Sequence, residues 1–285
     1  MSPTSRRLAI ALLAAAPLGV PATSAFAQVP PAETAAVPAG ATYADIAGLA
    51  DSAPLVVRAK LRKLARIDDA RASVSRPGMA RFYVTADTQA LITGRSPIGQ
   101  SFAYLVDLPV DGRGKPIARK KDQVILFARP VSGRPGELQL VRPGAQIPWS
   151  EVNEGRVRRI VTALLEPDAP ARVTGVRELI HVPGTLAGEG ETQIFLNTDS
   201  AAAASITVRR QPGQAPQWGV SFSELVADVS RPPERDTLEW YRLACFLPRK
   251  APADANLSEG PEARSMADAD YRMVVASLGP CRRTL

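Results

Sequence analysis

The chain has 285 residues, 45% of them hydrophobic, and a formal net charge of +7. This length and composition are sufficient for a real hydrophobic core in one large domain or two small ones. The charge is modest for the length, so it argues against dedicated nucleic-acid binding and favours weak attraction to anionic surfaces.

The first 27 residues have the pattern of a secretory signal peptide. Two arginines precede an apolar run over residues 8–20, and an A-x-A motif ends at Ala27, directly before Gln28. The run is too short for a membrane span, which needs about 20 residues. We therefore expect cleavage between Ala27 and Gln28, a periplasmic location and a mature charge of +5. The paired arginines leave both the unfolded-chain route and the twin-arginine route of export open.

Residues 28–41 are rich in alanine, proline and threonine and show no apolar period. This composition predicts a disordered leader. A short helix is expected over residues 43–53, with Ile46 and Leu49 on one face.

A period of two begins at Leu55, where apolar and basic residues alternate as in a strand with one buried face. Four further apolar runs, separated by glycine- and proline-rich turns, predict strands over residues 81–92, 102–108, 124–128 and 137–141. Five strands followed by a helix suggest a small antiparallel β-barrel of the OB-like type.

The clearest helix is expected over residues 150–166. Val157, Ile160 and Val161 lie on one stripe, Ser150 can cap the start, and Pro167 enforces a stop.

The proline-rich residues 167–170 are the expected domain boundary, with a barrel-like domain over 42–168 and an α+β domain over 169–285. Residues 171–182 have an ambiguous pattern. Strands are expected at 192–197, 205–210 and 217–222, and capping-box patterns predict helices at 236–246 and 265–279. The whole chain is therefore expected to be a mixed α+β protein.

Cys245 and Cys281 are the two cysteines of the chain. An even number in an exported protein indicates a disulfide. A redox pair would have the C-x-x-C spacing, which is absent, so we expect a structural bond.

Catalytic chemistry has few candidates. His181 is the single histidine, and its apolar neighbours favour a structural role. Glu189, Glu191 and Asp199 could serve a carboxylate-dependent hydrolase with or without His181, although solvated charges explain them with fewer assumptions. No metal-ligand cluster or phosphate loop is evident, so neither a metal nor another cofactor is expected.

Arg58, Lys60 and Arg62 would project from one face of the first strand and could meet an anionic partner. That strand carries no aromatic residue for base stacking, so nucleic acid is not expected as the partner. A solvated face that opposes aggregation is the simpler interpretation.

Residues 191–196 and 240–245 resemble uncharacterised exported proteins of high-GC alphaproteobacteria, and the arginine bias, 29 of 35 basic residues, fits such a genome. The resemblance would extend over most of the mature chain, and it implies export but no particular activity.

Residues 53–57, the strand stop at Thr93 and Gly94, and residues 122–128 give the first half a fainter likeness. It is similar to netrin-like OB modules, including tissue inhibitors of metalloproteinases. The resemblance implies the barrel topology alone, because those inhibitors depend on an N-terminal cysteine that this half lacks.

The leading hypothesis from the sequence is a non-catalytic binding or structural module of the envelope. It would bind an unidentified envelope partner or ligand through the barrel face or a cleft between the halves. The alternatives are a periplasmic carboxylate-dependent hydrolase and a polyanion-binding protein.

Overall fold

Two sheets and four α-helices make up the part of the chain that the computed structural model describes, residues 40–68, 77–95, 97–223 and 231–285. The predicted signal peptide, its cleavage site and the predicted leader up to residue 39 lie outside these residues. Among the described residues, no helix is long and apolar enough to cross a membrane.

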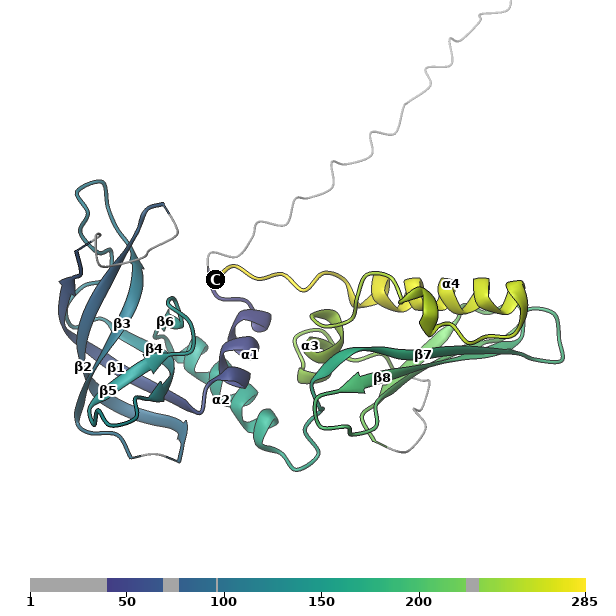
Figure 1. Cartoon of the computed structure of the whole chain (residues 1–285), viewed down its shortest axis with the longest axis horizontal. Coiled ribbons are helices and arrows are strands. Elements are labelled where there is room, and N and C mark those ends of the chain that lie inside the picture. Colours follow the sequence, from purple (N-terminus) through teal and green to yellow (C-terminus); the bar gives the residue numbers. More distant parts are fainter. Residues whose placement is uncertain (1–39, 69–76, 96, 224–230) are drawn as a thin grey trace, which may run out of the picture. The chain divides into compact units, whose positions relative to one another are not determined.

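The first half contains a closed five-stranded β-barrel (Figure 1). Its strands follow one another in the order β1-β2-β3-β5-β4, and β1 pairs with both β2 and β4, which closes the barrel. The bounds are β1 (Leu55–Arg66), β2 (Met79–Gly94), β3 (Ser101–Pro109), β4 (Gln123–Pro130) and β5 (Glu137–Leu140). The predicted five-stranded barrel is thus confirmed.

The barrel differs from the prediction in two details. β3 and β5 run parallel, whereas the other strand pairs are antiparallel. A short strand, β6 (Gln146–Pro148), also adds to β4. Neither feature has a signal in the local period, because both depend on which strands meet after folding.

The alternation along β1 explains why it forms a barrel wall. Val57, Ala59 and Leu61 are fully buried, while Lys60 and Arg62 between and after them are exposed. Such a strand buries one face in the core and leaves the other in water.

Two helices pack together beside the barrel, α1 (Tyr43–Ser52) and α2 (Glu151–Leu165). Thr42 and Asp45 form a capping box at α1, which was not predicted. The Ser150 hydroxyl accepts a hydrogen bond from the Asn153 amide at α2 and caps this helix, as predicted. Val157, Ile160 and Val161 form the buried stripe of α2.

The second sheet is an antiparallel meander in the order β10-β9-β8-β7. Its strands are β7 (Val173–Pro183), β8 (Gly190–Thr198), β9 (Ser205–Arg210) and β10 (Gln217–Ser221). The ambiguous residues 171–182 therefore belong mainly to a strand. Figure 1 shows α4 (Gly260–Leu278) lying along β7 and β8.

Both predicted capping boxes of the second half are wrong. α3 (Leu238–Ala244) is capped by Thr237, because Asp236 adopts a left-handed conformation with φ 62° and lies outside the helix. α4 begins at Gly260, not at Ser265, since Pro261 fits the first helical turn, where its missing amide proton costs nothing. A 3-10 turn, η1 (Ala253–Ala255), precedes α4.

The Sγ atoms of Cys245 and Cys281 lie 2.05 Å apart, at disulfide bonding distance, as predicted from the sequence. All described residues belong to one compact unit. The domain boundary expected at residues 167–170 stays a prediction.

Candidate binding groove on the barrel

A groove of about 580 Å³ lies on the outside of the barrel between β3 and the chain that contains β5. Its walls come from β2, β3, β5, the end of β4, the β4–β5 loop and residues 141–143. Pockets that bind small molecules have volumes of about 300–1,000 Å³, so the groove is of sufficient size for a ligand.

The groove exists because β3 and β5 pair over a very short distance. Their parallel pairing covers Ala103 with Glu137 and Tyr104 with Leu138. Further along β3, the Asp107 amide donates a hydrogen bond to the Pro143 carbonyl at 2.8 Å. Between the paired residues and this hydrogen bond, the two segments are separated, and the groove opens there.

An apolar surface extends along the groove. Leu138 and Leu140 are buried, whereas Tyr83 and Leu105, cross-strand partners on β2 and β3, are 38% and 48% exposed. The Tyr104 hydroxyl donates to the Gln146 Oε1 at 2.6 Å, and burial raises the pKa of Tyr104 far above its usual value. Tyr104 is therefore a neutral structural side chain, and Tyr83 and Leu105 are the apolar groups available for contact.

Arginines surround this apolar surface: Arg81, Arg129, Arg134 and Arg142. Arg81 donates to both carboxylate oxygens of Asp107, at 2.7 and 3.0 Å, and this hydrogen bonding raises its pKa. Arg134 pairs with Glu137 at 3.3 Å.

Arg129 differs from these two arginines. Its Nε donates to the amide oxygen of Gln139 at 3.1 Å, and it forms no ion pair with a carboxylate in the described part of the chain. Its positive charge is consequently available to an anion in the groove.

The three basic residues singled out in the sequence do not line this groove. Arg58 donates to Glu154 at 3.1 Å and lies over the Trp149 ring, 5.2 Å from its centroid. The Trp149 indole also donates to Glu154 at 2.6 Å and is the main cause that lowers the pKa of that carboxyl group. Arg58 has the outward phase of Lys60 and Arg62, as expected, but its side chain is only 28% exposed because it is bound to Trp149 and Glu154 and links the barrel to α2.

Lys60 is exposed, and Arg62 pairs at 3.4 Å with Asp87, an interaction between two well-exposed side chains. These two residues face solvent, as expected.

His181 lies in a buried polar network under α4. Its Nδ1 is 2.8 Å from the Thr192 hydroxyl, which donates to Asp270, and Asp270 also accepts from Arg210. Because the Thr192 proton is directed to Asp270, the imidazole donates from Nδ1 to Thr192. Burial lowers the pKa of His181, with Asp270 opposing and Arg210 adding to that effect.

The three carboxylates proposed for hydrolysis do not converge on His181. Glu189 accepts from the Leu186 amide in the β7–β8 turn, and Glu191 pairs with Arg209 at 3.2 Å. Glu191 and Thr192 are adjacent in a strand and so point to opposite faces of the sheet. Asp199 follows the far end of β8, about 30 Å from Glu189 at the usual rise per residue of a strand.

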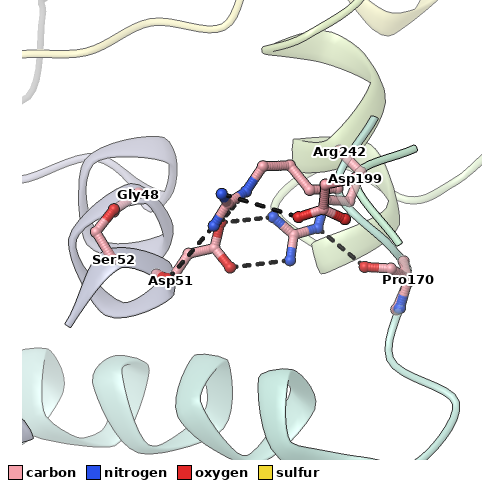
Figure 2. Close-up of polar contacts among 7 residues, drawn as sticks. Gly48, Asp51, Ser52, Pro170, Asp199 and Arg242 are labelled. Carbon is pink, nitrogen blue, oxygen red and sulfur yellow. Dashed lines mark hydrogen bonds and ion pairs between the residues drawn. The ribbon is translucent and has the colours of Figure 1, made fainter. Parts of the chain in front are cut away.

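A second cluster of charges joins three elements (Figure 2). Asp51 at the end of α1 accepts from Arg172 at 2.7 Å and from Arg242 of α3 at 2.7 and 3.0 Å, while Arg242 also donates to the Pro170 carbonyl. Asp199 lies 3.9 Å from Arg172. Burial raises the pKa of Asp51, but hydrogen bonds from the two arginines outweigh it and leave the pKa below its usual value. These groups satisfy one another, which indicates a structural role.

No group of three or more histidine, cysteine, aspartate or glutamate side chains that could hold a metal ion is found among the described residues. The residues of the groove were missed by the sequence reasoning. One indication was present in the sequence of β3. Leu105 is on the same outward side of this strand as the polar residues Ser101 and Asp107, which places an apolar side chain on the surface.

Comparison with known proteins adds no family assignment. A scan against protein-family models and a search of the curated proteins both find no match to this chain.

Proposed function

We propose that this protein is a non-catalytic binding module of the bacterial envelope, exported through residues 1–27, and that its barrel is OB-like. The strand order β1-β2-β3-β5-β4, closed by β1 and β4, supports the OB-like assignment. OB-like barrels bind ligands over strands 2 and 3 and the loops between strands 1 and 2 and between strands 4 and 5. The groove lies over β2, β3 and the β4–β5 loop.

The ligand would carry a carboxylate or phosphate group beside an apolar or planar part. The observation that carries this proposal is the meeting of Arg129, which has no described carboxylate partner, with the exposed Tyr83 and Leu105 in one groove. Guanidinium groups recognise carboxylates and phosphates through paired hydrogen bonds, and tyrosine offers a rigid surface for stacking.

Anilinonaphthalene sulfonate, an aromatic anion with strong environment-dependent fluorescence, is a suitable first probe. We expect it to bind the purified protein at one site, and Arg129→Glu to weaken that binding by about tenfold or more, as loss of a charged hydrogen bond implies. Tyr83→Ser should weaken binding as well. Carboxylated and phosphorylated ligands can then be ranked by displacement of the probe.

The control is Arg249→Glu, which makes the same charge change at an exposed position outside the groove. Equal loss of binding in Arg129→Glu and Arg249→Glu would refute a site in the groove. Melting curves of each variant exclude probe binding to unfolded protein.

A further inference from the structure

A different surface of the barrel gathers most of the lysines of the chain. Residues 60–68 of β1 and beyond lie beside the β3–β4 loop, residues 110–122. The Lys121 amide donates to the Leu61 carbonyl at 2.8 Å, and the Leu61 amide donates to the Asp122 carbonyl at 2.9 Å. Further along, Arg66 donates to the Gly114 carbonyl at 3.2 Å. The two segments therefore present their exposed side chains together.

The charge of these segments is strongly positive. Residues 60–68 and 111–122 contain nine basic and three acidic side chains. Five of the six lysines of the chain are among them, in a protein whose other basic residues are almost all arginine. We call these five the lysine face: Lys60, Lys63, Lys115, Lys120 and Lys121.

The charges of the lysine face are not used inside the protein. All five side chains are exposed, and none forms an ion pair with a described residue. Elsewhere, arginines such as Arg58, Arg81 and Arg242 are bound to carboxylates. The lysine face is thus a cluster of positive charges, unpaired within the described part of the chain, that is exposed to solvent.

An exposed apolar side chain stands in the middle of the charged loop. Ile117 is 62% exposed, between Lys115 and Arg119, and its backbone is fixed by a hydrogen bond to the Pro109 carbonyl at 3.0 Å. Water is an unfavourable environment for this side chain, and neighbouring cations would hold it against an anionic surface.

We propose that the lysine face docks on a membrane surface rich in anionic lipid headgroups, and that Ile117 enters the boundary between headgroups and acyl chains. Basic residues near anionic lipids and an inserted apolar side chain are the two elements of interfacial binding. Lysine suits this role because its long apolar stem can lie in the interface while its ammonium group stays in water.

A nucleic acid fits the lysine face less well than a lipid surface. Single strands are held by aromatic side chains between the cations, and neither of the two segments contains an aromatic residue. An exposed isoleucine contributes nothing to a phosphate backbone. The groove and the lysine face are different surfaces, so this inference stands independently of the ligand proposed for the groove.

Sedimentation with vesicles tests the proposal. We compare vesicles of phosphatidylcholine alone with vesicles that contain an equal share of phosphatidylglycerol. The purified protein should bind the anionic vesicles, and more weakly as salt is added. The double variant Lys115→Glu with Lys120→Glu should lower the partition coefficient by more than about 25-fold, at about fivefold for each lysine near an anionic surface. Ile117→Ser should lower it with little change in salt dependence.

The matched control is Arg249→Glu with Lys250→Glu, the same change in net charge at two exposed positions elsewhere. This variant should bind nearly as the unaltered protein does. Equal losses in the two double variants, or equal binding to neutral and anionic vesicles, would overturn the proposal. Tight retention on heparin without vesicle binding and without an effect of Ile117→Ser would replace the lipid surface by a soluble polyanion.

Discussion

At the scale of single residues, Asp51 shows how one carboxylate can stabilise two cations. Arg242 has a side chain only 6% exposed, and both of its terminal nitrogens donate to Asp51. Arg172 donates to the same carboxylate from a more exposed position. A buried guanidinium without an anionic partner is costly, so Asp51 matters mainly because its loss would leave Arg242 uncompensated.

We therefore expect Asp51→Asn to lower the free energy of unfolding by about 3–5 kcal/mol, the cost of breaking a buried ion pair. Urea unfolding at neutral pH measures this change. Asp87→Asn is the matched control, because its partner Arg62 is 62% exposed and such a pair contributes about 1 kcal/mol or less. Similar losses in the two variants would contradict the structural role of Asp51.

Lys121 is a second informative residue, since it adopts a left-handed backbone conformation with φ 75°. Residues other than glycine are strained there by about 1 kcal/mol. The tight turn requires this conformation. The Arg119 amide donates to the Asp122 carboxylate, and the Asp122 amide donates to the Arg119 carbonyl, so the chain must reverse at Lys121. A lysine is thus present where glycine would fit better, as expected if its charge is useful.

Lys121→Gly should raise the free energy of unfolding by up to about 0.5 kcal/mol, because the relief of strain slightly exceeds the added entropy of the unfolded chain. Lys120→Gly should lower it, since Lys120 is not in the left-handed region. Urea unfolding of the two variants gives the comparison. Destabilisation by both would show that the turn does not strain Lys121.

At the scale of elements, buried polar groups attach α4 to the second sheet. Asp270 of α4 accepts from Thr192 of β8 and Arg210 of β9, and Thr192 in turn contacts His181 of β7. One helix is therefore connected to three strands. The neutral imidazole with its proton on Nδ1 already satisfies this network, and Arg210 already supplies the positive charge opposite Asp270.

This arrangement predicts a pH dependence of stability. Burial lowers the pKa of His181 in the folded protein, so the unfolded chain takes up the proton first as pH falls. The free energy of unfolding should decrease below the ordinary histidine pKa of about 6.5, with a slope of at most about 1.4 kcal/mol per pH unit.

His181→Gln should remove this decrease between pH 5 and 7, because the chain has a single histidine. Urea unfolding at several pH values provides the test. Asp45, Asp51 and Glu154 have lowered pKa values and lose their contribution from about pH 5 downward, so they affect only the lower edge of this window. An unchanged slope in His181→Gln would contradict the assignment.

Some strands could be predicted from the sequence and others could not. The strands of the barrel were predictable because β1, β3 and β4 keep a regular period or a continuous apolar run. β7 was ambiguous because two register shifts, at residues 173–175 and 176–178, break its period. Its buried residues Val173, Val176 and Leu179 consequently follow one another at intervals of three.

The groove could not be predicted in the same way. It depends on the parallel pairing of β3 with β5 and on its early end, which are contacts between segments far apart in the sequence. The alternation along β3 indicated that Leu105 points outward. Nothing in the sequence indicated that Arg129 of β4 would line the same groove. Of the lysine face, the sequence indicated the exposed Lys60, because it alternates with buried residues in β1. The position of the β3–β4 loop beside β1 depends on tertiary contacts and could not be predicted.

At the scale of the whole molecule, residues 281–285 connect the second half to α1. The Thr284 amide and hydroxyl both donate to Asp45 at 2.9 Å, and the Arg282 carbonyl accepts from Thr42 at 2.9 Å. Arg283 lies over the Tyr241 ring and against Gly48, where a Cβ atom would be 2.7 Å from its guanidinium group. Cys281 begins this segment and is bonded to Cys245 at the end of α3.

The disulfide should therefore stabilise both the second half and the attachment of residues 281–285 to α1. Cys245→Ser with Cys281→Ser should lower the free energy of unfolding by about 3–4 kcal/mol, because the bond closes a loop of 36 residues in the unfolded chain. Urea unfolding measures this loss. Hydrogen exchange should also become faster at the Thr284 and Leu285 amides, which donate to Asp45.

The exchange measurement separates two origins of the stabilisation. Thr284→Val removes a hydroxyl that donates to Asp45 but keeps the disulfide, so it should speed exchange locally with a loss of about 1 kcal/mol. If the cysteine variant loses stability while exchange at Thr284 is unchanged, the disulfide acts on the unfolded chain alone. The attachment of this segment to α1 would then depend on Asp45 and Thr42 rather than on the cysteine pair.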